Sequence, residues 1–155
     1  MTLNLNELVR GGTFCLTKAG LAAGSSTDGM RTNDPSGASY FNFCINGIMY
    51  SCEDADNNVD FTASTQTALY SCLYVCCIAS DNTITVVAGT EVLTADVTSG
   101  KKVLHWPAPT ADTCAFGGVK VVATAVFTAG TTALGTGNTA TYYDFFAVPA
   151  TPITS

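Results

Sequence analysis

The stretch Tyr40-Phe-Asn-Phe-Cys-Ile-Asn-Gly-Ile-Met-Tyr-Ser-Cys52 is the clearest indication of fold in this sequence. Residues of alternating character stand on both sides of Asn46 and Gly47. An Asn-Gly pair readily adopts the positive φ angles of a type I′ turn, and alternation with a period of two is typical of paired strands. The stretch therefore predicts a β-hairpin.

A second pair of strands follows the hairpin. Residues 68–79 predict one long strand because they are rich in aromatic and β-branched residues, and a turn at 80–82 leads into a strand at 83–87. Successive side chains of a strand point to opposite faces. Both faces of the long strand are apolar, which indicates a central strand: Cys72, Tyr74 and Cys76 share one face, and Leu73, Val75 and Cys77 share the other.

The rest of the chain also favours strands. Residues 118–127 and 139–148 predict two more, residues 91–113 predict a loop with at most one short strand, and residues 129–138 form a Gly/Thr-rich connection. No sustained apolar stripe of helical period is present. We expect an all-β protein whose residues 38–155 form a single β-sandwich or jelly-roll-like domain, with a barrel as the alternative arrangement.

Residues 1–37 lack a regular apolar pattern and are expected to lie outside that domain. They are either a disordered tail or an extended arm that becomes ordered along a neighbouring subunit. Isolated apolar residues favour the arm, because a purely solvated tail has no use for them; they include Leu3, Leu5, Leu8 and Phe14.

The net charge and the hydropathy of the chain limit the kinds of partner that it can bind. The net charge is −6 and only 12% of residues are charged, so a phosphate-binding surface and hence nucleic-acid binding are not expected. The start of the chain lacks the pattern of a secretory signal, and no apolar run approaches the roughly 20 residues that span a bilayer. We expect a soluble protein that is made in a cytoplasm and does not bind a membrane.

The residues that usually carry chemistry are sparse. The one histidine, His105, stands in a loop beside Trp106 and Pro107. Seven cysteines occur without a C-x-x-C motif, which favours buried thiols over disulfides or zinc. The acidic stretch 53–60 lacks the Gly and Glu of a calcium loop. The sequence therefore predicts no catalytic residue, cofactor or metal site, and a protein that is not an enzyme.

Several strand and turn motifs within residues 40–146 resemble those of small structural proteins of tailed bacteriophages. They are Phe41-x-Phe-x-Ile-Asn-Gly-x-x-Tyr50, Val86-x-x-Gly-Thr-Glu91, Gly118-Val-Lys-Val-Val122, Phe127-Thr-x-Gly-Thr-Thr-x-Leu134 and Thr139-x-Thr-Tyr-Tyr-Asp144. The resemblance implies a virion structural protein of the capsid decoration (cement) type. It implies a homotrimer on the outer capsid surface that bridges neighbouring major capsid subunits.

The aromatic residues supply candidate interface positions. Together with the apolar residues of the arm, we expect the oligomer or capsid interface to use Tyr40, Phe43, Tyr50, Tyr142, Tyr143, Phe145 and Phe146. The alternative is that these side chains belong to the core. A second candidate function is a trimeric head-fibre or tail-fibre module that binds a host surface glycan or protein, with Trp106 and Asp112 as the visible candidates for a glycan site.

Overall fold

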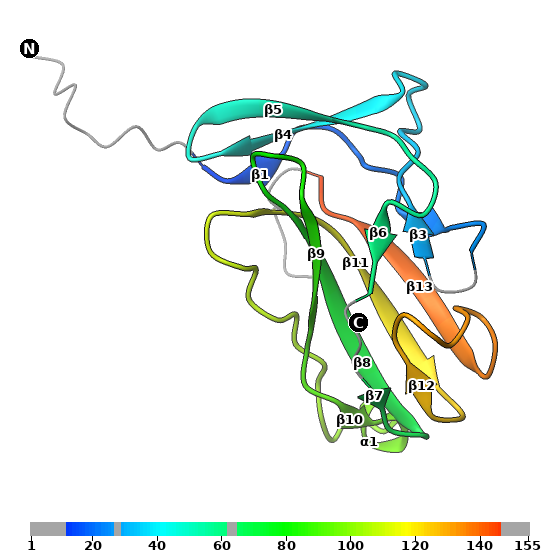
Figure 1. Cartoon of the computed structure of the whole chain (residues 1–155). Coiled ribbons are helices and arrows are strands. Elements are labelled where there is room, and N and C mark those ends of the chain that lie inside the picture. Colours follow the sequence, from blue (N-terminus) through cyan, green and yellow to red (C-terminus); the bar gives the residue numbers. More distant parts are fainter. Residues whose placement is uncertain (1–11, 27–28, 62–64, 147–155) are drawn as a thin grey trace, which may run out of the picture.

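The computed structural model describes residues 12–26, 29–61 and 65–146, and it confirms the all-β fold class (Figure 1). Two layers of antiparallel strands pack face to face in a sandwich-like arrangement. The one helix in these residues is α1 (Thr94–Thr98). An arrangement of this kind arises because each layer has one apolar face that must be covered.

The larger layer, called here the main sheet, is built around two long strands. β8 (Tyr70–Ile78) and β11 (Cys114–Ala123) pair along most of their length, and β13 (Asn138–Asp144) pairs with the other side of β11. β9 (Ile84–Ala88) and the short β10 (Val92–Leu93) pair with β8. The predicted central strand is confirmed, since residues 71–78 are all buried.

The second layer consists of three small sheets. β1 (Phe14–Cys15), β4 (Tyr40–Ile45) and β5 (Ile48–Glu53) form the first. β2 (Ala22–Ala23), β3 (Gly29–Arg31) and β6 (Val59–Asp60) form the next. β7 (Thr65–Gln66) and β12 (Phe127–Thr128) form the last. In Figure 1 the β4–β5 hairpin lies across the upper end of the main sheet, and β7 and β12 lie at its lower end.

Aromatic side chains fill the space between the layers. Phe41 of the hairpin contacts Phe116 of β11, with ring centroids 5.1 Å apart. Farther down the sandwich, Phe61 packs edge-on against Tyr74 at 5.2 Å and against Phe127 at 6.0 Å. Edge-to-face pairs of this kind add to the free energy gained by burial. The two layers therefore share one continuous core.

The predicted hairpin is confirmed in detail. Asn46 and Gly47 have φ angles of 51° and 82°, which are the left-handed values of a type I′ turn. The register pairs Ile45 with Ile48 and Phe43 with Tyr50. The turn chemistry of two residues therefore sets which side chains of β4 and β5 share a face.

Residues 12–37 differ from the expected arm, because those described are part of the sandwich. β1 pairs with β4, and β3 lies between β2 and β6. Ala19 and Met30 are completely buried in the core. Strands of two or three residues are too short to produce a periodic sequence pattern, which is why the sequence of this segment does not predict them. The expected boundary at residue 37 is therefore not a boundary of the folded domain.

Two other segments differ from expectation in their limits. The strand expected at residues 118–127 begins at Cys114, passes an irregularity between Ala115 and Gly117, and ends at Ala123. Phe127 belongs instead to β12. The segment 91–113 contains β10 and α1 before its loop.

Candidate functional site

The outer side of β5 is an exposed strand edge, and four of the six residues of this strand are exposed. β5 stands at the end of the strand order β1-β4-β5, so one of its sides has no neighbouring strand among the described residues. Next to a two-residue turn, Ile45 and Ile48 exchange backbone hydrogen bonds, and bonded and non-bonded pairs then alternate. The N–H and C=O groups of Met49, Ser51 and Glu53 consequently point away from β4.

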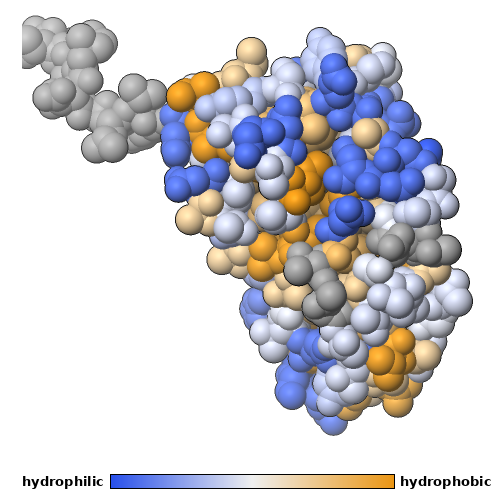
Figure 2. All heavy atoms as spheres, viewed as in Figure 1, coloured by the Kyte–Doolittle hydropathy of each residue, from blue (hydrophilic) through white to orange (hydrophobic). Residues whose placement is uncertain are grey.

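The turn end of this strand is apolar. Ile48 and Met49 are 60% and 67% exposed, and Phe14 lies half-buried beside Cys44, on the same face as Met49. Figure 2 shows apolar surface where the β4–β5 turn lies in Figure 1. Glu53 is the one charged residue of β5, and the strand has no Lys or Pro. Natural edge strands that avoid pairing usually carry such residues. We call the outward backbone groups of β5 with Ile48 and Met49 the β5 edge.

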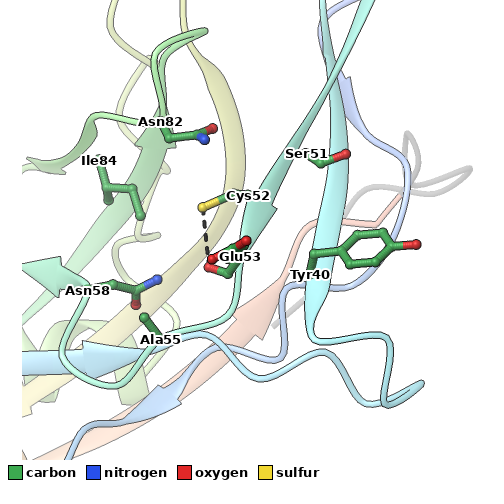
Figure 3. Close-up of a pocket in the computed structure, with 8 residues that line it drawn as sticks. All are labelled: Tyr40, Ser51, Cys52, Glu53, Ala55, Asn58, Asn82 and Ile84. Atoms are coloured by element: carbon green, nitrogen blue, oxygen red, sulfur yellow. Dashed lines mark hydrogen bonds between the residues drawn. The ribbon is translucent and has the colours of Figure 1, made fainter.

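A hollow of about 530 Å³ lies beside the β5 edge and is called here the hairpin groove (Figure 3). Three parts of the chain line it: the open end of the hairpin, the connection from β5 to β6, and the turn from β8 into β9. In Figure 3 the Cys52 thiol points toward Asn82 and Ile84, whereas Tyr40 and Ser51 lie on the other side of the strand. The lining residues are Tyr40, Ser51, Cys52, Glu53, Ala55, Asn58, Asn82 and Ile84.

Carboxylates near the groove hold the loops together. An Asp54 carboxylate oxygen accepts a hydrogen bond from the Asp34 N–H at 2.6 Å, and Asp56 accepts one from the Ser25 N–H at 3.0 Å. Hydrogen bonds from Ser25 lower the pKa of the Asp56 carboxyl below its ordinary value. The acidic stretch 53–60 thus connects to residues 25–34 through one oxygen each of Asp54 and Asp56, whereas Oδ1 of Asp54 is buried and has no hydrogen-bond partner among the described residues.

The predicted interface residues of the hairpin separate into two groups. Tyr40 is 44% exposed and lines the groove. Phe43 is completely buried, and Tyr50 stacks on it with ring centroids 5.6 Å apart. The expectation that Phe43 lies at an interface is therefore wrong, because its side chain is completely buried on the core face of the hairpin. Leu3, Leu5 and Leu8 lie outside the described residues.

The C-terminal aromatic residues face two different environments. Tyr142 points toward the core with Val119, and burial raises the pKa of its hydroxyl. Tyr143 lies on the opposite face of β13 and packs edge-on against Trp106, as does Phe145. Phe146 is 50% exposed. These residues do not form one surface with the β5 edge, so the expected interface divides between two sides of the molecule.

The cysteines behave as core residues, as the sequence predicts. All seven are buried and free. Burial raises the pKa of Cys15 and of Cys114 to about 12, and it also raises the pKa of Cys76. These thiols are protonated at neutral pH, and a thiol is a far weaker nucleophile than a thiolate.

Sequence reasoning did not find the residues just before β6 and β9 that complete the groove. Asn82 has a φ of 65° in the β8–β9 turn, and Asn58 follows a turn at Asn57. Local turn signals predict that these positions bend. They do not predict that two separate bends lie beside the same hairpin.

Comparisons with protein-family models, with curated proteins and with solved structures find no match to this chain. Among the residues described here, no helix has the length and apolar character to cross a membrane.

Proposed function

We propose that this chain is a non-enzymatic structural protein that docks onto the outside of a phage capsid and cements neighbouring major capsid subunits. The observation that carries the proposal is the β5 edge, with backbone groups that no described strand pairs with and its apolar end at Ile48 and Met49. The phage assignment rests on the strand and turn motifs of residues 40–146.

The β5 edge suits docking onto an extended segment of another protein. Strand addition provides main-chain hydrogen bonds, and neighbouring pockets accept alternate side chains. Fully burying one side chain such as Ile48 contributes about 1.5–3 kcal/mol before the costs of association. One copy therefore makes only a modest contact. In a homotrimer that binds several capsid subunits at once, such contacts combine through their high effective concentration.

Residues 1–11 are proposed to act as the bridging arm. They hold Leu3, Leu5 and Leu8, and they lead into β1, which pairs with the side of β4 opposite to β5. The arm thus starts at the same small sheet that carries the β5 edge. On this proposal the protein is made in the host cytoplasm and acts on the outer capsid surface, with itself and the major capsid protein as partners. Neither nucleic acid nor membrane is required.

Binding to undecorated capsids of the encoding virus tests the proposal. Light scattering should give the mass of a trimer, and the protein should sediment with the capsids. Met49→Lys places a charge at the β5 edge and should weaken capsid binding at least ten-fold. Val126→Lys is the matched control, because Val126 is 58% exposed in the connection between β11 and β12 and should leave binding unchanged.

The proposal fails if the unaltered protein stays with the supernatant, or if both variants bind equally well. Circular dichroism and the thermal midpoint should be the same for the two variants, since both positions are exposed. That comparison separates a lost contact from a lost fold.

A fibre module that binds a host glycan is the second candidate function. The hairpin groove favours it, because two amides (Asn58 and Asn82) line the hollow and the exposed ring of Tyr40 lies at its border, on the other side of the strand (Figure 3). Sugars bind where apolar rings and a few convergent polar groups meet. Glycan-array binding that is lost in Tyr40→Ala and Asn82→Ala, without capsid binding, would support this function and contradict the cement proposal.

A further inference from the structure

A second hollow, of about 180 Å³, lies on the face of the main sheet that points away from the core. The loop after α1, yellow-green in Figure 1, crosses this face. Leu73 of β8 and Lys120 of β11 are paired in register and form the floor, and the loop supplies the walls. We call this hollow the Trp106 pocket; its principal lining residues are Leu73, Val97, Leu104, Trp106, Lys120 and Tyr143.

The indole of Trp106 is held in place by the sheet beneath it. A Cβ atom at Gly118 would lie 2.5 Å from Cζ3 of the indole, so the ring occupies the space that any other residue would fill. Tyr143 and Phe145 pack edge-on against the same ring, with centroids 5.5 Å and 5.1 Å away. The aromatic wall of the pocket is therefore preformed, which reduces the entropy lost when a ligand binds.

Lys120 is the unusual feature of the pocket. Its side chain rises from the middle strand of the main sheet and is partly buried between Leu73 on β8 and Thr141 on β13. Within the described residues, the salt bridge found is between Lys102 and Asp96, at 3.7 Å, and no carboxylate lies at ion-pair distance from Lys120. Its ammonium therefore has no described carboxylate partner and is available to pair with an anion.

Lys102 adds a second ammonium at the rim of the pocket. It lines the hollow and is 63% exposed, and it pairs with the Asp96 carboxylate at 3.7 Å. The chain as a whole carries a net charge of −6. Two lysines beside one apolar hollow are therefore unusual for this chain. The pocket therefore has the ammonium of Lys120 at its floor, the Lys102–Asp96 ion pair at its rim, and apolar or aromatic walls.

We propose that the Trp106 pocket binds a small carboxylate that carries a flat apolar group, such as an arylacetate. The carboxylate would pair with Lys120, and the apolar group would lie between Trp106, Tyr143 and Leu104. The volume equals that of about six water molecules at about 30 Å³ each, which suits a single substituted ring. This site lies on the main sheet, away from the β5 edge, and does not depend on the proposed function.

Trp106 makes the site directly measurable, because it is the only tryptophan in the chain. The full-length protein is titrated with phenylacetate, with the neutral analogue 2-phenylethanol and with acetate, at constant ionic strength, while indole emission is recorded. Phenylacetate should give a saturable change in emission. The alcohol and acetate should bind at least ten-fold more weakly, because each lacks one of the two parts that the pocket recognises.

Lys120→Met keeps the side-chain length and removes the charge. It should weaken phenylacetate binding at least ten-fold and leave 2-phenylethanol binding unchanged. Lys101→Met is the matched control: Lys101 is exposed and does not line the pocket, so its removal should change neither affinity. Amide chemical shifts of residues 100–106 provide a second readout if the emission is insensitive.

Three outcomes would overturn the proposal. They are the absence of any saturable change in emission or in those amide shifts, equal affinity for phenylacetate and 2-phenylethanol, and undiminished phenylacetate binding by Lys120→Met. Circular dichroism of the lysine variant establishes that it is folded.

Discussion

Gly118 determines how closely the loop after α1 approaches the main sheet. Its missing side chain leaves room for the indole of Trp106 above β11, and the carbonyl oxygen of Tyr74 closes the space from the side of β8. A Cβ atom at this position would lie 2.7 Å from that oxygen, which is a backbone atom and cannot turn aside. The absence of a side chain at Gly118 thus allows the loop to pack closely on the sheet. The indole that packs there forms the aromatic wall of the Trp106 pocket.

Gly118→Ala should therefore destabilise the protein. We expect a loss of about 1–3 kcal/mol in the free energy of unfolding, as for other overpacked sites. Trp106 emission should shift to longer wavelength as the indole is displaced into water. Urea denaturation and emission spectra measure the two effects. Thr141→Ala, on the exposed part of the same face, is the control and should change stability by less than about 0.5 kcal/mol.

Because the cysteine thiols are buried, the free energy of unfolding should decrease at alkaline pH. Burial raises the pKa of Cys15 and of Cys114 from 9.0 to about 12, so the folded protein keeps protons that the unfolded chain releases. Stability from these groups is fully present below pH 9 and is lost as the pH rises toward 12. Urea denaturation from pH 7 to 10.5 should show a decrease that begins near pH 9. A constant free energy of unfolding across that range would contradict this account.

At the scale of the element, β5 has two sides with opposite roles. Its inner side bonds to β4, and on its outer side the described residues form no neighbouring strand. The alternation of an antiparallel pair assigns Tyr50 and Cys52 to the inner bonds and Met49 and Ser51 to the outer side. The register therefore decides which backbone groups remain free for a partner.

Proline substitutions along β5 test this assignment. Proline has no N–H, so Tyr50→Pro removes a bond to Phe43, whereas Ser51→Pro removes only an outward donor and the side-chain bond to Asn42. We expect Tyr50→Pro to lower the free energy of unfolding by about 1–3 kcal/mol more than Ser51→Pro, because it leaves the Phe43 carbonyl unsatisfied and also removes the ring that stacks on Phe43. Equal losses in urea denaturation would show that the register is not as described.

At the scale of the whole molecule, residues 12–37 complete the sandwich. Cys15, Ala19, Leu21 and Met30 contribute buried side chains to the core. The Leu21 N–H donates to the Asp144 carboxylate at 2.9 Å and thereby connects this segment to the last strand of the main sheet. The segment is held by contacts with strands that follow it by more than a hundred residues.

Two truncations should consequently behave differently. Deleting residues 1–37 removes four buried core residues and β1 to β3, and we expect a chain without cooperative unfolding. Deleting residues 1–11 should leave the thermal midpoint within a few degrees of the full chain. Circular dichroism with thermal scans distinguishes the two. Unchanged trimer stability and capsid occupancy after the shorter deletion would eliminate the proposed arm.

Local sequence determined the elements whose geometry depends on neighbouring residues. The φ preferences of Asn46 and Gly47 and the alternation around them were sufficient to predict the hairpin, and the apolar residues of 71–78 were sufficient to predict a strand buried on both faces. The odd number of cysteines, seven, together with the lack of C-x-x-C motifs, predicted free, buried thiols. These features depend on local dihedral preferences, on the alternation of side chains and on composition. All three can be read from a short stretch of sequence.

The tertiary structure alone decided which separate segments meet. Buried Gln66 donates to the carbonyl oxygens of Tyr70 and Val121 and accepts from the Tyr74 hydroxyl, an arrangement with no local signal. The hairpin groove and the Trp106 pocket likewise need partners more than twenty residues apart. Such contacts depend on how the two layers pack, and packing is a property of the whole chain, because a side chain is buried only when a distant element covers it.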